Sequence, residues 1–277
     1  MKRLIPFLLL AFLCPLMTIH AQDNATYIGV WRAGKKTQKL YPATDNLFEI
    51  EKKAKAQGYA QLADLELLTT EFPYSESNWS VWEKPTTYNS IWTAGTWSNI
   101  VKDFQRFQKG TGRNRRYISN IESYYSVANK VIYFHGIFKS GTRKQNLIRS
   151  FSWEGFVKDW ESLRRKNMRL QQVETLNRHG KIYFFSIFSE GTGGHYLYNL
   201  VGWDNFVKKW QELGKKNYRL VDIESYVQNG QRHYIGVWHY GKDGYVLYNV
   251  KGFNNFKKKM DEFGRQGLEL IDLEVIR

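Results

Sequence analysis

Leu220-Val-Asp-Ile-Glu224 recurs fifty residues later as Leu270-Ile-Asp-Leu-Glu274. Related segments with glutamate at the same place occur three times upstream. The glutamates are Glu66, Glu122, Glu174, Glu224 and Glu274, at intervals of 56, 52, 50 and 50 residues. An aromatic residue keeps a similar period at Trp31, Trp82, Phe138, Phe188 and Trp238. Two markers with one period near fifty residues indicate a tandem array of supersecondary units.

The fourth copy shows what one unit contains. Trp203, Phe206, Trp210 and Leu213 are spaced 3, 4 and 3 residues apart, which places them on one face of a helix. Three segments follow, separated by turn signals. They alternate apolar and polar residues or are rich in β-forming residues, and they predict three consecutive antiparallel strands. These strands span residues 218–226, 233–240 and 245–250.

The predicted fold is therefore α+β, with five tandem β-β-α-β type repeats. Each repeat is an antiparallel meander with one helix, and the array forms a curved sheet or half-barrel. The units span roughly residues 27–67, 78–123, 133–175, 183–225 and 234–275 of one domain, residues 22–277.

The middle strand of each unit has two apolar faces. In Tyr27-Ile-Gly-Val-Trp31, one face carries aromatic, glycine and aromatic residues, and the other carries isoleucine and valine. We expect the β-branched face to pack on the helix. The glycine then leaves a gap on the aromatic face that a neighbouring ring fills. Because one unit cannot bury two apolar faces, the units must stack edge to edge.

Residues 1–21 have the features of a secretory signal peptide, with Lys2 and Arg3 before an apolar stretch. We therefore expect a bacterial protein that is secreted or periplasmic. An uncleaved anchor and a lipoprotein processed at Cys14 are alternatives. Cys14 is the single cysteine of the chain, so removal of the signal leaves no disulfide or thiol chemistry.

The chain is basic, with a formal charge of +15, and loss of Lys2 and Arg3 subtracts two to leave +13. Such an excess favours anionic partners, an acidic glycan or lipopolysaccharide for example. The alternative is a solvated basic surface, because the lysines cluster on the polar faces of the predicted helices. Runs of this kind are Lys208-Lys209, Lys215-Lys216 and Lys257-Lys258-Lys259.

The five recurrent glutamates favour a structural role, because an enzyme needs one site and not five. We expect each to accept a hydrogen bond from an indole, a tyrosine hydroxyl or a lysine of its own repeat, since a buried carboxylate without a partner is costly.

The segment Tyr218-Arg-Leu220, with the aromatic helix before it and Tyr234-Ile-Gly-Val-Trp238 after it, resembles a bacterial tandem repeat. Similar arrays form the amino-terminal, tryptophan-rich domain of polyglycine hydrolases. The resemblance implies a β half-barrel with an accessory or recognition role. It implies no activity, because the serine hydrolase domain of those enzymes is missing. No serine in this chain has lysine three residues later.

Other chemistry has weaker signals. The histidines lack the i, i+4 spacing of a helical metal site, so we expect neither a metal nor any other cofactor. A hydrolase would need a carboxylate pair, for which Glu190 with Asp243 is the candidate. The basic insert Gly110-Thr-Gly-Arg-Asn-Arg-Arg116 would suit nucleic acid, but an exported chain is not expected to meet it.

Aromatic residues are the best candidates for binding, since flat apolar rings contact sugars or extended peptides at low entropic cost. We predict a groove lined by Trp31, Trp82 and Trp238, with Tyr240, Lys242 and Tyr245 at its rim. The alternative is that these rings are interior packing. The predicted function is a non-enzymatic exported module that binds an extracellular glycan, another polymer or a protein.

Overall fold

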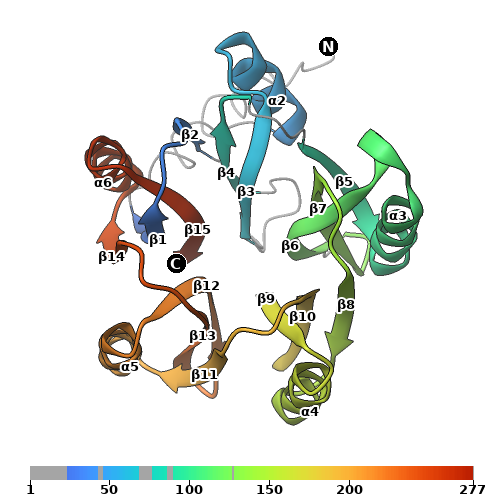
Figure 1. The fold of residues 1–277 in the computed structure, drawn as a ribbon, viewed down its shortest axis with the longest axis vertical. Helices are drawn as coiled ribbons and strands as arrows, with labels where there is room; N and C mark the ends of the chain where they lie inside the picture. The colour runs from blue at the N-terminus through green and yellow to red at the C-terminus, as the bar shows by residue number, and fades with distance from the viewer. Residues whose placement is uncertain (1–23, 43–45, 69–76, 86–89, 127, 277) are drawn as a thin grey trace, which may run out of the picture.

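The computed structural model describes residues 24–42, 46–68, 77–85, 90–126 and 128–276. Over these residues the chain forms five separate three-stranded antiparallel sheets, each accompanied by one helix. The predicted α+β class with five tandem units is confirmed. The sheets surround a common centre, and the helices lie at the outside (Figure 1). The predicted signal peptide lies outside the described residues.

Each unit contains an outer strand, a helix, an inner strand and a middle strand. The outer strands are β2 (Gln38–Tyr41), β5 (Ser90–Thr96), β8 (Gln145–Ser150), β11 (His195–Val201) and β14 (Tyr245–Lys251). The helices are α2 (Leu47–Ala56), α3 (Trp97–Lys109), α4 (Trp153–Arg164), α5 (Trp203–Lys215) and α6 (Phe253–Arg265). Among the described residues, no helix is both long and apolar enough to cross a membrane.

The inner strands are β3 (Gln61–Leu68), β6 (Arg116–Ser126), β9 (Met168–Arg178), β12 (Tyr218–Gln228) and β15 (Leu268–Ile276). The middle strands are β4 (Ser77–Glu83), β7 (Val131–Ser140), β10 (Lys181–Glu190), β13 (Gln231–Tyr240) and β1 (Thr26–Ala33). In every sheet the middle strand lies between the outer and the inner strand.

The three strands of each sheet are not the three consecutive strands that the sequence predicted. Strands β12 and β13 pair as expected across the turn at Asn229 and Gly230, but β14 does not join them. Instead, β11 pairs with the free edge of β13, and β14 belongs to the next sheet. The helix makes this possible, because it carries the chain from the outer strand across to the inner strand on the far side of the middle strand.

The first strand of the chain completes the last unit. Strand β1 lies between β14 and β15, where Tyr27 pairs with Val250 on one side and Val275 on the other. The inner strands contact one another in the order β3, β6, β9, β12 and β15, and β15 in turn contacts β3. The array therefore curves until the fifth unit meets the first, as Figure 1 shows.

A bulge in every inner strand determines which side chains face the centre. In β3, Leu62 and Asp64 oppose consecutive residues of β4, so Ala63 is the extra residue. The extra residue shifts the alternation of side chains. As a result Leu62 and Leu65 both join the apolar cluster under the helix, whereas Asp64 points away from it. Equivalent register shifts occur in the other four sheets.

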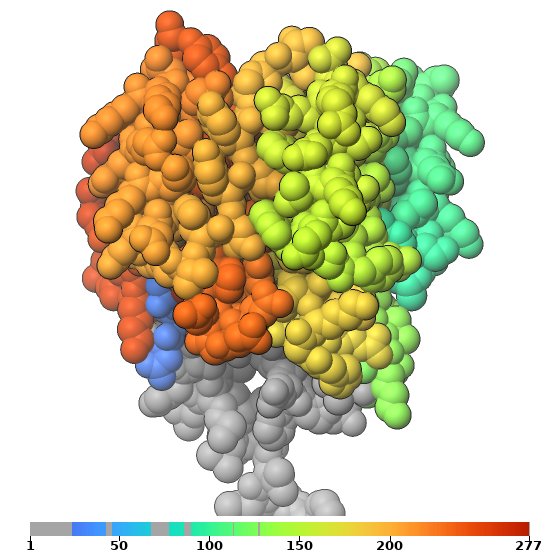
Figure 2. Space-filling view, turned by 90° about the horizontal axis from the view of Figure 1, so that it is seen from below, coloured from blue at the N-terminus to red at the C-terminus, as the bar shows by residue number. Residues whose placement is uncertain are grey.

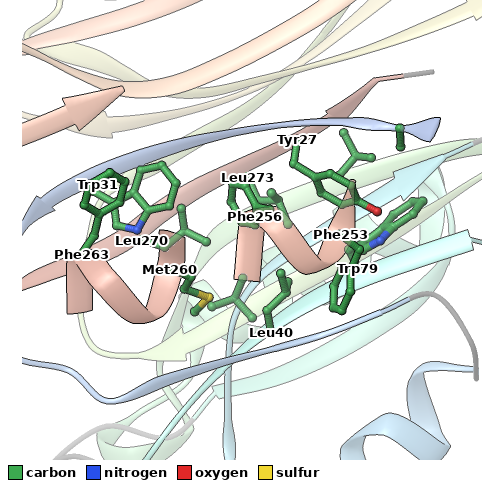
Figure 3. Close-up of a cluster of buried hydrophobic side chains, with 13 residues drawn as sticks. Tyr27, Trp31, Leu40, Trp79, Phe253, Phe256, Met260, Phe263, Leu270 and Leu273 are labelled. Carbon is green, nitrogen blue, oxygen red and sulfur yellow. The ribbon is translucent and has the colours of Figure 1, made fainter. Parts of the chain in front are cut away.

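The aromatic face of the middle strand, and not the β-branched face, packs on the helix. Tyr27 and Trp31 contact Phe256 of α6 at ring-centroid distances of 5.5 and 5.4 Å (Figure 3). Ile28 and Val30 pack in a cluster with side chains of the fourth unit. Our expectation was wrong because both faces are apolar, so periodicity alone cannot say which one meets the helix.

The strand glycine makes room for an aromatic ring, as expected. A Cβ atom on Gly236 would lie 2.2 Å from Cη2 of Trp238 on the same strand and 2.9 Å from Phe206 of the helix. Gly29 and Trp31 repeat this arrangement in the fifth unit. The ring that fills the gap thus comes chiefly from the glycine's own strand.

Gly236→Ala should lower the free energy of unfolding by about 1–3 kcal/mol, because the added methyl group overpacks the site under Trp238. Chemical denaturation of the purified variant measures the change. Gly264→Ala is the control, since Gly264 lies in α6 and a Cβ there meets nothing within 4 Å. It should stabilise the chain by about 0.5–1 kcal/mol, the usual gain in a helix. Equal effects of the two variants would contradict this account of the core.

Candidate functional site

The three tryptophans predicted to line a groove are buried in three different units. Trp31, Trp82 and Trp238 have exposed fractions of 0, 1 and 0%. Each packs in an apolar cluster that includes residues of its own unit's helix. They do not line a surface groove in this structure, and interior packing, the alternative interpretation, describes their position. The reason is the assignment of faces described above, which turns these rings towards the helices.

The three residues predicted for the rim have different environments. Tyr240 is 52% exposed, and Lys242 is exposed in the loop that follows it. Tyr245 is only partly exposed, because the Arg219 guanidinium lies 4.0 Å from its ring centroid and Trp210 packs on its edge. Tyr240 and Lys242 therefore remain available to a ligand.

Loops that follow the middle strands gather on one side of the ring. In four units the first glycine of the loop donates its backbone N–H to a carbonyl just beyond a helix, at 2.8 to 3.1 Å. We call this side the loop face, comprising residues 34–37, 141–144, 191–194 and 241–244 with the helix ends that they contact. It carries many exposed cations, among them Lys35, Arg143, Lys144, Lys166, Lys242 and Arg265.

A cluster of tyrosines reaches the loop face in the fourth unit. Tyr218 is at its centre, with ring-centroid distances of 4.6 Å to Tyr196 and 5.9 Å to Tyr240. Tyr196 is 36% exposed, and Tyr198, its neighbour on the same strand face, lies under the Lys209 ammonium at 4.6 Å. Sequence reasoning found Tyr240 and missed Tyr196 and Tyr218, although the alternation of Tyr196 and Tyr198 was a signal for one shared face.

Acidic and amide side chains of the inner strands meet at the centre of the ring and join the units. Asp222 accepts from the backbone N–H of Val173 at 2.9 Å, and Asp272 accepts from that of Ile223 at 2.7 Å. The same bond closes the ring, since Asp64 of the first unit accepts from Leu273 N–H of the fifth unit at 2.8 Å. Gln172 makes the equivalent contact, and Asn120 donates to Asp64.

The recurrent glutamates form a second set of hydrogen bonds between neighbouring units. Ser123 donates its backbone N–H and its hydroxyl to Glu174 at 2.9 and 2.7 Å. Thr175 Oγ1 donates to Glu224 at 2.7 Å, again from one unit to the next. A structural role fits these contacts, but the expected partners were wrong. For Glu174, Glu224 and Glu274 the donors are backbone or hydroxyl groups of the adjacent repeat. Glu122 accepts from the backbone N–H of Leu67 and also from the side-chain amides of Gln172 and of Asn120, the last in its own repeat.

Burial makes these eight carboxyl groups weak acids. It raises the pKa of Asp64 to about 7 and those of Glu174 and Glu274 to about 8. Burial and the charges of neighbouring carboxylates raise the pKa well above the ordinary range for Glu66, Glu122, Asp222, Glu224 and Asp272. Two cations oppose these shifts: Lys139 lowers the pKa of Asp64, and Arg232 lowers that of Glu274.

The central cluster can hold protons at neutral pH, which is unusual for carboxylic acids. Among the described residues, no group of three or more histidine, cysteine, aspartate or glutamate side chains is placed to hold a metal ion. The other carboxylates considered from sequence have separate partners. Asp243 forms an ion pair with Arg32, and Glu190 accepts from the backbone N–H of Lys144 at 3.4 Å.

The basic insert of the second unit packs against the loop face. Residues Gly112–Asn114 form a short 3₁₀ turn, η1. The carbonyl of Arg115, just after it, accepts the backbone N–H of Gly141 at 3.1 Å.

Comparison with protein-family models, curated proteins and solved structures finds no significant match for this chain.

The central carboxyl groups should make the protein more stable at pH 6.5 than at pH 8. A carboxyl group whose pKa is raised by folding binds its proton more tightly in the folded chain, so its contribution is full below about pH 4 and is lost as the pH rises through about 7 to 8. Burial lowers the pKa of His239 to about 4, which opposes this trend only below about pH 6.5. We expect a difference of about 2 kcal/mol or more in the free energy of unfolding, since one pKa unit corresponds to about 1.4 kcal/mol.

Glu224→Gln tests the origin of this pH dependence. The amide oxygen can still accept from Thr175, but the group no longer titrates. Denaturation curves between pH 6.5 and pH 8 should show a smaller slope for this variant, whereas Glu161→Gln, on the exposed face of α4, should leave the slope unchanged. A wild-type stability that is flat or rises over this range would refute the assignment.

Proposed function

We propose that this chain is an exported, non-enzymatic binding module that recognises an extracellular anionic polymer or glycan through its loop face. The observation that carries the proposal is the exposed tyrosine cluster of the fourth unit, next to cations on the same face. A protein partner with an acidic surface would meet the same chemistry.

The tyrosines suit a carbohydrate because they combine flat apolar faces with hydroxyl groups at their edges. Tyr240 and Tyr196 are exposed side by side with Tyr218, so they present a surface and not isolated rings. The strands that carry them belong to one sheet, which holds the rings in place before a ligand arrives. Such pre-organisation lowers the entropic cost of binding.

The distribution of charge also supports an anionic ligand. Eight carboxyl groups are withdrawn to the centre of the ring, where burial raises their pKa and favours the protonated form. They therefore offset little of the positive charge at the surface. The loop face carries exposed lysines and arginines that attract polyanions at low ionic strength.

Export and the accessory role remain parts of the proposal. The first 21 residues support export because they have the pattern of a signal peptide. The likeness of the repeat to the accessory domain of polyglycine hydrolases supports recognition of a polymer and not its cleavage.

Tyr240→Ala should weaken binding of an acidic polysaccharide by about three- to tenfold, the loss of one aromatic contact. The test uses the mature chain, residues 22–277, with polygalacturonate and with its neutral methyl ester, by calorimetry at several salt concentrations. Phe151→Ala is the control, since Phe151 is 50% exposed but precedes α4 at the opposite edge of the ring.

Equal binding by the two variants would show that the tyrosine cluster is not the contact surface. A complete lack of retention at low salt, for polygalacturonate and for a wider panel of peptidoglycan and lipopolysaccharide, would contradict the proposed function itself.

A further inference from the structure

The junctions between units carry a pair of positions that face each other on the loop face. One is the second residue before the extra, bulged residue of the inner strand, directly before a buried leucine or isoleucine. The other is the third residue of the loop that follows the middle strand. Four junctions have both positions among the described residues, and three of them contain a matched pair.

The matched pairs differ in chemistry but each is complementary. At the junction of the second and third units, which we call the second junction, the Arg143 guanidinium lies 4.3 Å from the ring centroid of Tyr117. At the junction of the fifth and first units, Lys36 Nζ lies 3.7 Å from Glu269 Oε1. Between the fourth and fifth units, Arg219 Nε donates to the Asp243 carbonyl at 2.7 Å, and the Asp243 carboxylate binds Arg32.

The junction of the third and fourth units lacks the partner. The strand position is Arg169, but the loop position is Gly193, which has no side chain. Arg169 lies against this loop, since Cβ atoms on Gly191 and Gly193 would be 2.4 and 2.8 Å from its guanidinium group. Its Nε is buried without a hydrogen-bond partner, and no ion pair joins it to any acidic group in the described part of the chain.

A second buried polar atom at this junction is also without a partner. At the second junction and at the closing junction, Gln145 and Gln38 bond the backbone of Ile118 and Leu270. His195 has the equivalent position here and is 7% exposed, yet its Nε2 has no partner. Its ring meets the edge of Trp160, over which Arg164 lies at 5.6 Å.

Arg164 and Arg169 place positive charge beside His195 at this loop. Burial lowers the pKa of both His195 and His239, and Arg169 lowers each pKa further. Glu190 directly precedes the loop, but its carboxylate accepts from the backbone of Lys144. An unpaired buried donor is costly, and a guanidinium group satisfied by a carboxylate gains strong charge-assisted bonds.

The tyrosine cluster lies on the other side of the same loop. A Cβ atom on Gly194 would be 2.6 Å from the Tyr218 hydroxyl. Because consecutive Cα atoms are about 3.8 Å apart and each Cβ atom lies about 1.5 Å from its Cα, the Arg169 guanidinium and this hydroxyl lie within roughly 12 Å of each other, a distance that an oligosaccharide can span. Figure 2 shows the two units that form this junction side by side, with α4 in yellow-green and α5 in orange.

We infer that the junction of the third and fourth units is a subsite for an acidic saccharide. Its carboxylate occupies the space beside Gly193 and pairs with the Arg169 guanidinium, while the sugar rings contact Tyr196, Tyr218 and Tyr240. This inference rests on the proposed binding function and gives it a site and a ligand class.

Two variants of the mature chain test the site with trigalacturonate as the probe, measured by calorimetry at about 0.1 M salt. Arg169→Gln removes the cation, and Gly193→Asp supplies an internal carboxylate that competes with the ligand. Both should weaken binding about tenfold or more, as loss of a charge-assisted contact requires. Gly193→Asp should also keep or raise the thermal midpoint, which leaves a test if Arg169→Gln fails to fold.

Arg165→Gln is the matched control, since this arginine is exposed at the end of α4 and should change binding less than about twofold. The Nε–H resonance of Arg169 should shift on titration of the wild type with trigalacturonate, and not with its methyl ester. Wild-type affinity in both test variants would overturn the site. Acetate that competes as well as trigalacturonate would overturn the saccharide assignment.

Failure of the site and failure of the proposed function give different results. Saccharide binding that persists unchanged in both variants removes only the Arg169 site. No binding of acidic or neutral saccharides by the wild type removes the proposed function as well.

Discussion

Hydrogen bonds from the backbone of one unit to a carboxyl or amide side chain of the next hold the ring together. The bulge in each inner strand makes these bonds available, because it turns Asp64 and its equivalents towards the neighbouring unit while the flanking leucines stay under the helix. Each unit both donates to its successor and accepts from its predecessor. This arrangement is complete only in a ring, and β1 supplies the missing middle strand of the fifth unit.

The same constraint explains why acidic residues recur in a basic protein. Asp64 accepts from Leu273 on one neighbouring inner strand and from Asn120 on the other, and a carboxyl group offers several acceptor sites on a short side chain. Crowding and burial then raise the pKa of each group, so protons take the place of counter-ions. Gln172 shows that a neutral amide can accept the same backbone bond, whereas Asn120, at the equivalent position of the second unit, donates to Asp64 instead.

Much of this architecture could be predicted from the sequence because it repeats. The periods of 2 and 3.6 residues identified strands and helices. Because the glutamate recurs in all five copies, the sequence favoured a structural role for it over a catalytic one. The roles of Trp31, Trp82 and Trp238 could not be deduced, since both faces of their strands are apolar and only tertiary packing selects one. The hydrogen-bond donors to Glu174 and Glu224 could not be predicted for a related reason. They come from another repeat, and a sequence pattern does not show which repeats are in contact.

A repeated scaffold also makes its exceptions informative. Because the junctions have similar geometry, a side chain that lacks a partner at one junction can be compared with the equivalent residues at the others. Asp243 shows that the loop position can hold a carboxylate, and Gly193 leaves that position open beside a cation and a tyrosine cluster. Selection for stability alone would favour filling such a gap, because an unpaired buried donor destabilises the folded chain. A binding site has the opposite requirement, since the missing group must come from the ligand.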